Sequence, residues 1–245
     1  MILAAGRGER MRPLTDHTPK PLLEVRGKPL MQWPLEALAR GGFTDVVVNT
    51  AWLGDRIEAR FGAVHRAADG ATSTSISYSH EGRDFGRALE TAGGIARALP
   101  LLDEVFWVVA GDVHAPDFVF SQIAFDRFAA GDRLAHLWLV PNPAHHPRGD
   151  FGLAGTRADG VALALNDTHP GGERFTFSTI ALYRRSFFEA PNGAIPPGNP
   201  DGIATPLAPL LRAAIAAGQV SAELHTGAWT DVGTPERLAA LDAPA

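Results

Sequence analysis

Residues 1–15 read MILAAGRGERMRPLT, a short apolar segment followed at once by glycines and arginines. The apolar residues predict a β-strand, and Gly6 and Gly8 predict a tight turn directly after it. Three arginines stand in that turn: Arg7, Arg10 and Arg12. A glycine turn can face its backbone N–H groups outward and form a concavity for an anion. The turn is therefore a candidate anion site, and a glycine turn with solvated arginines is the alternative.

Outward from this turn, apolar patterns alternate between strand and helix. The expected strands are residues 1–5, 45–49, 75–79 and 105–110, and the expected helices are residues 28–40, 53–61 and 90–99. This alternation predicts a doubly wound α/β fold whose mostly parallel sheet is covered on both faces. Ligands bind outside the carboxyl ends of the strands in such sheets, which is where the glycine turn stands.

The second half of the chain is richer in strands. Strands are expected at residues 134–140, 151–156, 161–165 and 175–183, and a long helix at about 205–217. We expect one continuous domain, residues 1–245, in which the part from about 116 elaborates the sheet of residues 1–115. Since the first strand has so few residues before its turn, the sequence leaves open whether the chain begins upstream of Met1.

Composition excludes several classes of protein. The chain has 245 residues, a net charge of −5 and no cysteine. The acidic balance argues against a protein that grips nucleic acid through phosphates, and the lack of cysteine excludes disulfides, thiolate metal sites and a cysteine nucleophile. The longest apolar run, residues 105–110, is far shorter than the ~20 residues that span a bilayer. We expect a cytoplasmic protein with neither a nucleic-acid nor a membrane partner.

Two common phosphate-binding loops do not fit the glycine turn. A Walker loop requires Gly-Lys followed by Ser or Thr, and Gly27-Lys28 is followed by Pro29. The dinucleotide fingerprint requires a third glycine at the position of Met11. A different feature points to phosphate, because Lys20 stands between Pro19 and Pro21. Each proline restricts the backbone around it, so the lysine is held nearly rigid.

The segment Leu3 to Thr15 together with the triplet Pro19-Lys20-Pro21 closely resembles the signature of the sugar-1-phosphate nucleotidyltransferases. The resemblance extends over nearly the whole chain. It implies a Rossmann-like, GT-A-like fold, with a nucleotide-binding half at about 1–115 and a sugar-binding half at about 116–245. It also implies that the following residues surround the nucleotide: Ala5, Gly6, Gly8, Lys20, Thr91 and Gly93.

Two separated carboxylates are the second candidate site. Asp112 follows the predicted buried strand 105–110, and Asp231 stands in a turn before a last short helix. Either one alone is a common turn former or helix cap. Mg²⁺ prefers one or two carboxylates completed by phosphate oxygens and water. The resemblance implies that Asp112 and Asp231 hold a catalytic Mg²⁺, while Arg10 contacts the leaving phosphates and Lys20 the α-phosphate.

The sequence gives weaker signals for the residues that would bind the base and the sugar. Thr91 is expected to cap a helix, and the glycine pair Gly93-Gly94 to let the backbone approach a base, although an ordinary capped turn is the alternative. The segment 141–152 resembles that of the short N-acetylmuramate-1-phosphate uridylyltransferases. A metal site at His145-His146 is disfavoured, because neighbours in an extended chain point to opposite sides. The sugar-binding candidates are Gly152, Glu173 and Ser178, with Arg148 or Arg174 for a carboxylate on the sugar.

The resemblance implies an enzyme that joins a sugar 1-phosphate, foremost N-acetylmuramate 1-phosphate, to UTP in peptidoglycan recycling, releasing pyrophosphate. Mannose-1-phosphate guanylyltransferase and glucose-1-phosphate thymidylyltransferase are the alternatives of the same type. A sugar-nucleotide sensor without catalysis is the alternative of a different type, and the joint presence of Arg10, Lys20, Asp112 and Asp231 argues against it. The expected partners are UTP and the sugar 1-phosphate, and the expected assembly is a monomer or small homo-oligomer.

Overall fold

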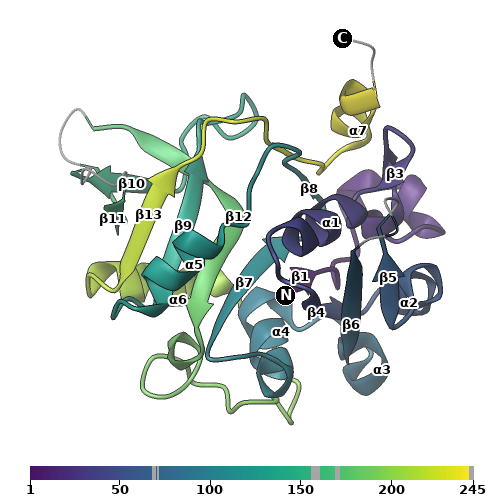
Figure 1. Ribbon diagram of the computed structural model, residues 1–245, viewed down its shortest axis with the longest axis horizontal. Coiled ribbons are helices and arrows are strands. Elements are labelled where there is room, and N and C mark those ends of the chain that lie inside the picture. The colour runs from purple at the N-terminus through teal and green to yellow at the C-terminus, as the bar shows by residue number, and fades with distance from the viewer. Residues whose placement is uncertain (68–69, 71, 156–160, 169–171, 243–245) are drawn as a thin grey trace.

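A computed structural model describes residues 1–67, 70, 72–155, 161–168 and 172–242. Its main feature is a ten-stranded sheet with the strand order β10-β11-β13-β9-β12-β7-β1-β4-β6-β5 (Figure 1). Two small ladders lie outside it, β2 with β3 and β14 with β8. Within the described ranges, no helix is both long and apolar enough to cross a membrane.

The first half of the chain forms the parallel part of the sheet. β1 pairs in parallel with β4 and β7, and β4 pairs in parallel with β6, while β5 adds an antiparallel edge. The elements of this half are β1 (Ile2–Leu3), β2 (Glu24–Val25), β3 (Lys28–Pro29), α1 (Gln32–Arg40), β4 (Asp45–Thr50), α2 (Gly54–Phe61), β5 (Val64–Arg66), β6 (Ser73–His80), α3 (Glu81–Phe85), α4 (Glu90–Ala98), β7 (Val105–Ala110) and β8 (Val113–His114). Short 3₁₀ turns stand at Glu9–Met11, Leu14–Asp16, Lys20–Leu22 and Leu99–Leu101.

The second half extends the same sheet with mainly antiparallel strands. The long strand β12 lies between β7 and β9 and is antiparallel to both. The elements are α5 (Gln122–Ala129), β9 (Ala135–Val140), β10 (Phe151–Ala154), β11 (Ala162–Leu165), β12 (Arg174–Arg184), a 3₁₀ turn (Arg185–Phe187), α6 (Leu207–Ala216), β13 (Val220–Leu224), β14 (Thr230–Asp231) and α7 (Pro235–Asp242). The two halves therefore share one sheet.

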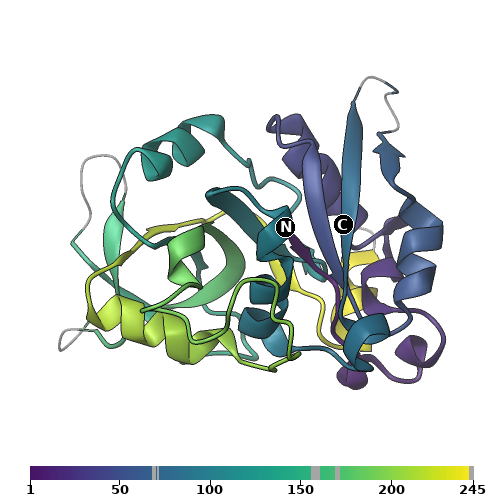
Figure 2. The same cartoon turned by 90° about the horizontal axis from the view of Figure 1, so that it is seen from below.

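Helices cover both faces of the sheet. α4 and α6 lie on one face, and α1 and α5 lie on the other (Figure 2). Apolar residues of α4 and α6, such as Ile95 and Leu211, pack in one core with Val108 and Tyr183. Leu35 of α1 belongs to a second core on the opposite face. Burial of apolar area on both faces is the main stabilising contribution of this architecture.

The C-terminal helix α7 packs back onto the N-terminal segment. Leu238 and Leu241 contact a small core formed by Met11, Leu23, Val25, Leu30 and Val232. The backbone N–H of Arg26 donates to Asp242 Oδ1 at 2.5 Å. The end of the chain thus lies beside the loop that follows the glycine turn.

The expected fold class is confirmed: the strands of the first half are mainly parallel, and the second half is mainly antiparallel apart from the parallel pair of β13 and β9. The strand expected at 105–110 has those bounds in the structure. The helix expected at 28–40 begins only at Gln32, because Lys28 and Pro29 form a short strand instead. α5 and β13 were not predicted.

Candidate active site

A cavity of about 730 Å³ lies at the carboxyl ends of β1, β4 and β7. This is the edge of the sheet at which we expected the ligand, and both halves of the chain contribute to its wall. The predicted site residues that line it are Ala5, Gly6, Lys20, Thr91 and Asp112.

The glycine turn supports Lys20. Gly8 has φ +67°, and a Cβ on it would stand 3.2 Å from Lys20 Cβ and 3.1 Å from Thr15 Cγ2. The Thr15 hydroxyl donates to the Gly8 carbonyl at 2.8 Å, which fixes the turn. Pro19 is extended, and Lys20 begins a 3₁₀ turn. A side chain at position 8 would therefore displace the lysine stem.

Lys20 forms an ion pair with Asp112. Its Nζ donates to Asp112 Oδ2. The side chains are 12% and 30% exposed, so the lysine is nearly enclosed while its carboxylate partner remains accessible from the cavity. The structure thus brings these two predicted residues together at the cavity.

Backbone hydrogen bonds join the segment that contains Asp231 to the segment that contains Asp112. Asp231 pairs with Val113 in the β14–β8 ladder, and the N–H of Val232 donates to the Asp112 carbonyl at 2.9 Å. The Asp231 Oδ1 accepts from Arg237 at 2.7 Å and lies 2.9 Å from His145 Nε2. Asp231 does not itself line the cavity, and its carboxylate is held by the side chains of Arg237 and His145.

Arg10 does not line the cavity, but its guanidinium group lies close to the turn that follows Asp231. An added Cβ on Gly233 would stand 3.4 Å from an Arg10 guanidinium nitrogen and 2.1 Å from one of Arg237. The two guanidinium groups thus flank the turn that follows Asp231. A third arginine, Arg7, lines the cavity and stacks on Trp52 at 3.6 Å from the ring centroid, which fixes its position.

The residues expected at the base divide into two groups. Thr91 lines the cavity together with Ala88 and Glu90. Thr91 is not a helix cap, because α4 begins at Glu90 and its first turn has no side-chain cap. Gly93 does not line the cavity, since an added Cβ would stand 2.4 Å from the Ile203 carbonyl oxygen. Gly93 instead permits close packing of α4 against residues 203–205.

A buried polar chain links the loops around the cavity. Asn49 Oδ1 accepts from the N–H of Ala4 at 2.8 Å, and Asn49 Nδ2 donates to Glu81 Oε1 at 2.6 Å. Glu81 Oε2 accepts from the N–H of Leu89 at 2.7 Å. Glu81 is fully buried, and this burial raises the pKa of its carboxyl group. The chain ties the glycine turn to the segment that precedes Thr91.

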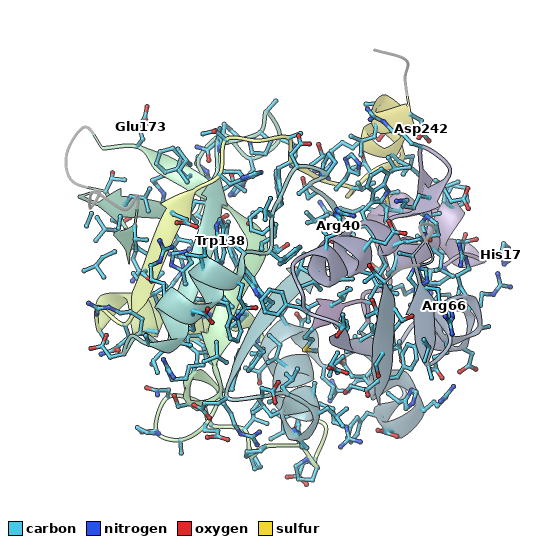
Figure 3. All side chains as sticks on the ribbon, viewed as in Figure 1. His17, Arg40, Arg66, Trp138, Glu173 and Asp242 are labelled. Carbon is cyan, nitrogen blue, oxygen red and sulfur yellow. The ribbon has the colours of Figure 1, made fainter. Side chains whose placement is uncertain are left out.

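The expected sugar-binding residues lie outside the cavity wall. Gly152 packs against residues 167–168, where an added Cβ would stand 2.8 Å from Thr168 Cγ2. Glu173 is exposed directly before β12 and lies at the outer edge of the molecule (Figure 3). Ser178 is fully buried, and its hydroxyl donates to the Trp138 carbonyl at 2.6 Å.

Other residues of the second half form the wall instead. These are Asp150, Phe151, Phe177, Thr179, Tyr183, Pro206, Leu207, Ala208, Leu211 and Arg212. Thr179 has φ +64°, a backbone conformation that a β-branched residue rarely adopts. Strain of this kind clusters at ligand sites. The neighbour of the predicted Ser178, rather than Ser178, therefore faces the cavity.

The adjacent histidines have separate partners. His145 contacts Asp231, whereas His146 Nε2 lies 3.1 Å from Asp150 Oδ1. In the part of the chain that the structure describes, no cluster of three or more His, Asp or Glu side chains could hold a metal. Any metal at Asp112 and Asp231 would rely on other oxygens for the rest of its coordination.

Sequence reasoning missed Glu81, Arg237 and Arg212. Glu81 becomes a site residue only through two hydrogen bonds from distant segments, for which the sequence carries no signal. Arg237 stands in the first turn of the last helix, six residues after Asp231. A cation so close in sequence to a candidate metal ligand is a usable signal. No sequence signal marks Arg212, because its helix contributes to the cavity only after the chain folds.

Comparison with known proteins agrees with this geometry. The nucleotidyl transferase family matches residues 1–183. The chain is 47% identical over 241 residues to the N-acetylmuramate alpha-1-phosphate uridylyltransferase of Neisseria meningitidis serogroup B, covering 97% of this chain and 94% of the relative. It is 31% identical over 250 residues to the protein of that name from Caulobacter vibrioides, covering 99% and 95%.

A solved structure shares the fold. It is a UDP-glucose pyrophosphorylase complexed with UDP-glucose, with a TM-score of 0.72 and 17% identity over 98% of this chain and 95% of that one. The cavity, the sheet and the two relatives lead to one conclusion: this chain belongs to the nucleotidyl transferase family and is a sugar-1-phosphate nucleotidyltransferase.

Proposed function

We propose that this enzyme joins N-acetylmuramate 1-phosphate to UTP, giving UDP-N-acetylmuramate and pyrophosphate, as a cytoplasmic step of peptidoglycan recycling. The choice of sugar and base is supported by the names of two relatives that align with nearly the whole chain. The observation that carries the reaction type is the meeting of the glycine turn, Lys20 and Asp112 at one cavity.

The reaction needs alignment and charge neutralisation more than it needs a base. An ionised phosphate oxygen of the sugar 1-phosphate attacks the α-phosphorus of UTP in line. A new phosphorus–oxygen bond forms, and the bond between the α-phosphorus and the bridging oxygen breaks as pyrophosphate leaves. Since the nucleophile arrives without a proton, the protein has no proton to remove.

Named groups of this chain would supply the positive charge. In this proposal, Lys20 binds the α-phosphate, where negative charge grows in the transition state. The backbone N–H groups of Gly6 and Gly8 would bind the remaining phosphates, and Arg10 would neutralise the leaving pyrophosphate. The ion pair with Asp112 holds Lys20 in place before the nucleotide arrives.

The two carboxylates fit a Mg²⁺ ion. Both offer hard oxygen donors, they come from adjoining backbone segments, and their side chains are 30% and 29% exposed. Two carboxylates are the number that Mg²⁺ commonly takes when phosphates and water complete its coordination. When bound, the ion would polarise phosphate oxygens and offset their charge. Lys20 and Arg237 offset the charge of the carboxylates themselves.

A panel of substrates tests the proposal. Four nucleoside triphosphates are combined with the 1-phosphates of N-acetylmuramate, N-acetylglucosamine, glucose and mannose, and pyrophosphate release is measured. We expect the highest kcat/KM for UTP with N-acetylmuramate 1-phosphate. Exclusive use of GTP or dTTP would indicate a guanylyl- or thymidylyltransferase instead. Binding of UDP-sugars without turnover of any pair would indicate a sensor.

A further inference from the structure

Arg212 is an exposed cation on the otherwise mainly apolar wall that the second half of the chain gives to the cavity. The other charged side chain of that wall is Asp150. Its Oδ2 accepts from the N–H of Phe177 at 2.8 Å, and its Oδ1 lies 3.1 Å from His146 Nε2. Asp150 is thus engaged by β12 and by His146, whereas Arg212 is available to a ligand.

The position of Arg212 is fixed by two contacts. Its guanidinium carbon lies 5.4 Å from the ring centroid of Phe151, which is 3% exposed and therefore held in place by the core. An arginine at this distance from a ring is attracted to the aromatic face. The carbonyl of Arg212 accepts from Asn166 Nδ2 at 2.8 Å, which joins α6 to the end of β11.

Among the described residues, Lys20 and Arg7 are the other cations that line the cavity, and each has a partner, although Arg7 Nη1 is buried without a hydrogen bond. Lys20 pairs with Asp112, and Arg7 stacks on Trp52 and lies 4.0 Å from Glu9. Within the described ranges, Arg212 has no carboxylate within 4.0 Å. A guanidinium group without an acidic partner, supported by an aromatic ring, suits a planar carboxylate of a ligand.

The two arginines that the sequence suggested for this role lie elsewhere. Arg174 donates to Asp167 at 3.0 Å and to the Asp150 carbonyl at 2.7 Å, and it does not line the cavity. Arg148 is exposed on the loop before β10 and does not line the cavity either. The choice therefore falls on a residue of α6.

We propose that Arg212 binds the carboxylate of the sugar substrate and so selects sugar acids over neutral amino sugars. This inference rests on the proposed function, because N-acetylmuramate differs from N-acetylglucosamine by a lactyl group that ends in a carboxylate. Arg212 contacts the part of the sugar that does not react. Its loss removes discrimination while the phosphate chemistry at Lys20 is retained.

The experiment compares wild type, Arg212→Gln, Arg212→Lys and Arg148→Gln. For each protein, kcat/KM is measured with N-acetylmuramate 1-phosphate and N-acetylglucosamine 1-phosphate at saturating UTP. Binding of UDP-N-acetylmuramate and UDP-N-acetylglucosamine is measured by calorimetry, so that a slow neutral substrate still gives a value. Thermal unfolding of each variant shows that it is folded.

We expect Arg212→Gln to lower kcat/KM and affinity for the carboxylated sugar by about 10- to 100-fold, the scale of one hydrogen bond to a charged group. Values for the neutral sugar change less than about twofold, and Arg212→Lys regains part of the loss. An equal loss for both sugars, no loss for either, or a selective loss in Arg148→Gln overturns the inference. If wild type itself does not prefer the carboxylated sugar, the proposed function fails, a result separate from any variant.

Discussion

Replacing Lys20 with Met removes one positive charge and keeps most of the side-chain stem. The stem continues to lie beside Gly8, and Asp112 remains about a third exposed to the cavity. Loss of a partly exposed ion pair costs only about 0–1 kcal/mol of the free energy of unfolding. The fold should therefore tolerate the substitution.

Catalysis should not tolerate it. Removal of one group that stabilises developing charge lowers kcat by about 10²–10³-fold, or about 2.7–4 kcal/mol of transition-state stabilisation. For Lys20→Met, we therefore predict that the lost transition-state stabilisation, calculated from kcat, is several times larger than the lost free energy of unfolding. Pyrophosphate release gives kcat, and urea denaturation gives the free energy of unfolding.

Lys28→Met is the matched control. Lys28 also donates to a carboxylate, Glu36 Oε2 at 2.6 Å, but it does not line the cavity. Glu36 is 7% exposed, so its lost partner costs more in stability than the loss at Asp112. We expect Lys28→Met to be less stable than wild type with a nearly unchanged kcat. A kcat of Lys20→Met within a few-fold of wild type would refute the role given to Lys20.

Three further predictions concern the surroundings of this pair. Gly8→Ala should cost about 1–2 kcal/mol through its positive φ and should raise KM for UTP, because the new Cβ displaces Lys20; unchanged steady-state kinetics would count against it. Glu81→Gln replaces one carboxylate oxygen with an NH₂ group, which would face either Asn49 Nδ2 or the N–H of Leu89 and leave a buried donor without an acceptor. This should lower the free energy of unfolding by about 1–3 kcal/mol. Burial raises the pKa of Glu81, so the stabilising contribution of Glu81 is complete below its ordinary pKa of about 4.5 and is lost as pH rises through the raised pKa. The difference in urea midpoint between wild type and Glu81→Gln should therefore narrow as pH rises. A difference that widens would contradict this. Asp231→Asn should raise the Mg²⁺ concentration for half-maximal activity by at least about tenfold and weaken Mn²⁺ binding measured by electron paramagnetic resonance, and an unchanged Mn²⁺ affinity would exclude Asp231 as a ligand.

The sequence predicted the parallel half of the fold because its strands and helices are strongly patterned. Residues 105–110 are apolar throughout and form a strand as expected, with residues 105–109 buried in the sheet. The glycine turn and the lysine between prolines are local features, so their position at one cavity could be predicted. Asp112 followed from its place directly after a buried strand.

The sugar half could not be predicted to the same depth, because its wall depends on contacts between distant segments. Ser178 and Thr179 are adjacent, and only the irregular backbone of β12 between Phe177 and Ala181 decides which of them faces the cavity. Gly93 and Gly152 are expected from the sequence to give room to a base and a sugar, but protein backbone or side chain occupies the space beside each of them. A glycine in the sequence does not say which partner approaches it.

A crystal structure with UDP-N-acetylmuramate and Mg²⁺ tests the central idea most directly, namely that the glycine turn, Lys20 and the two aspartates serve one polyphosphate. We predict density for the diphosphate beside Gly6 and Lys20, a metal within coordination distance of Asp112 and Asp231, and the sugar directed toward α6. A diphosphate bound elsewhere, with Lys20 still paired only to Asp112, would contradict the account.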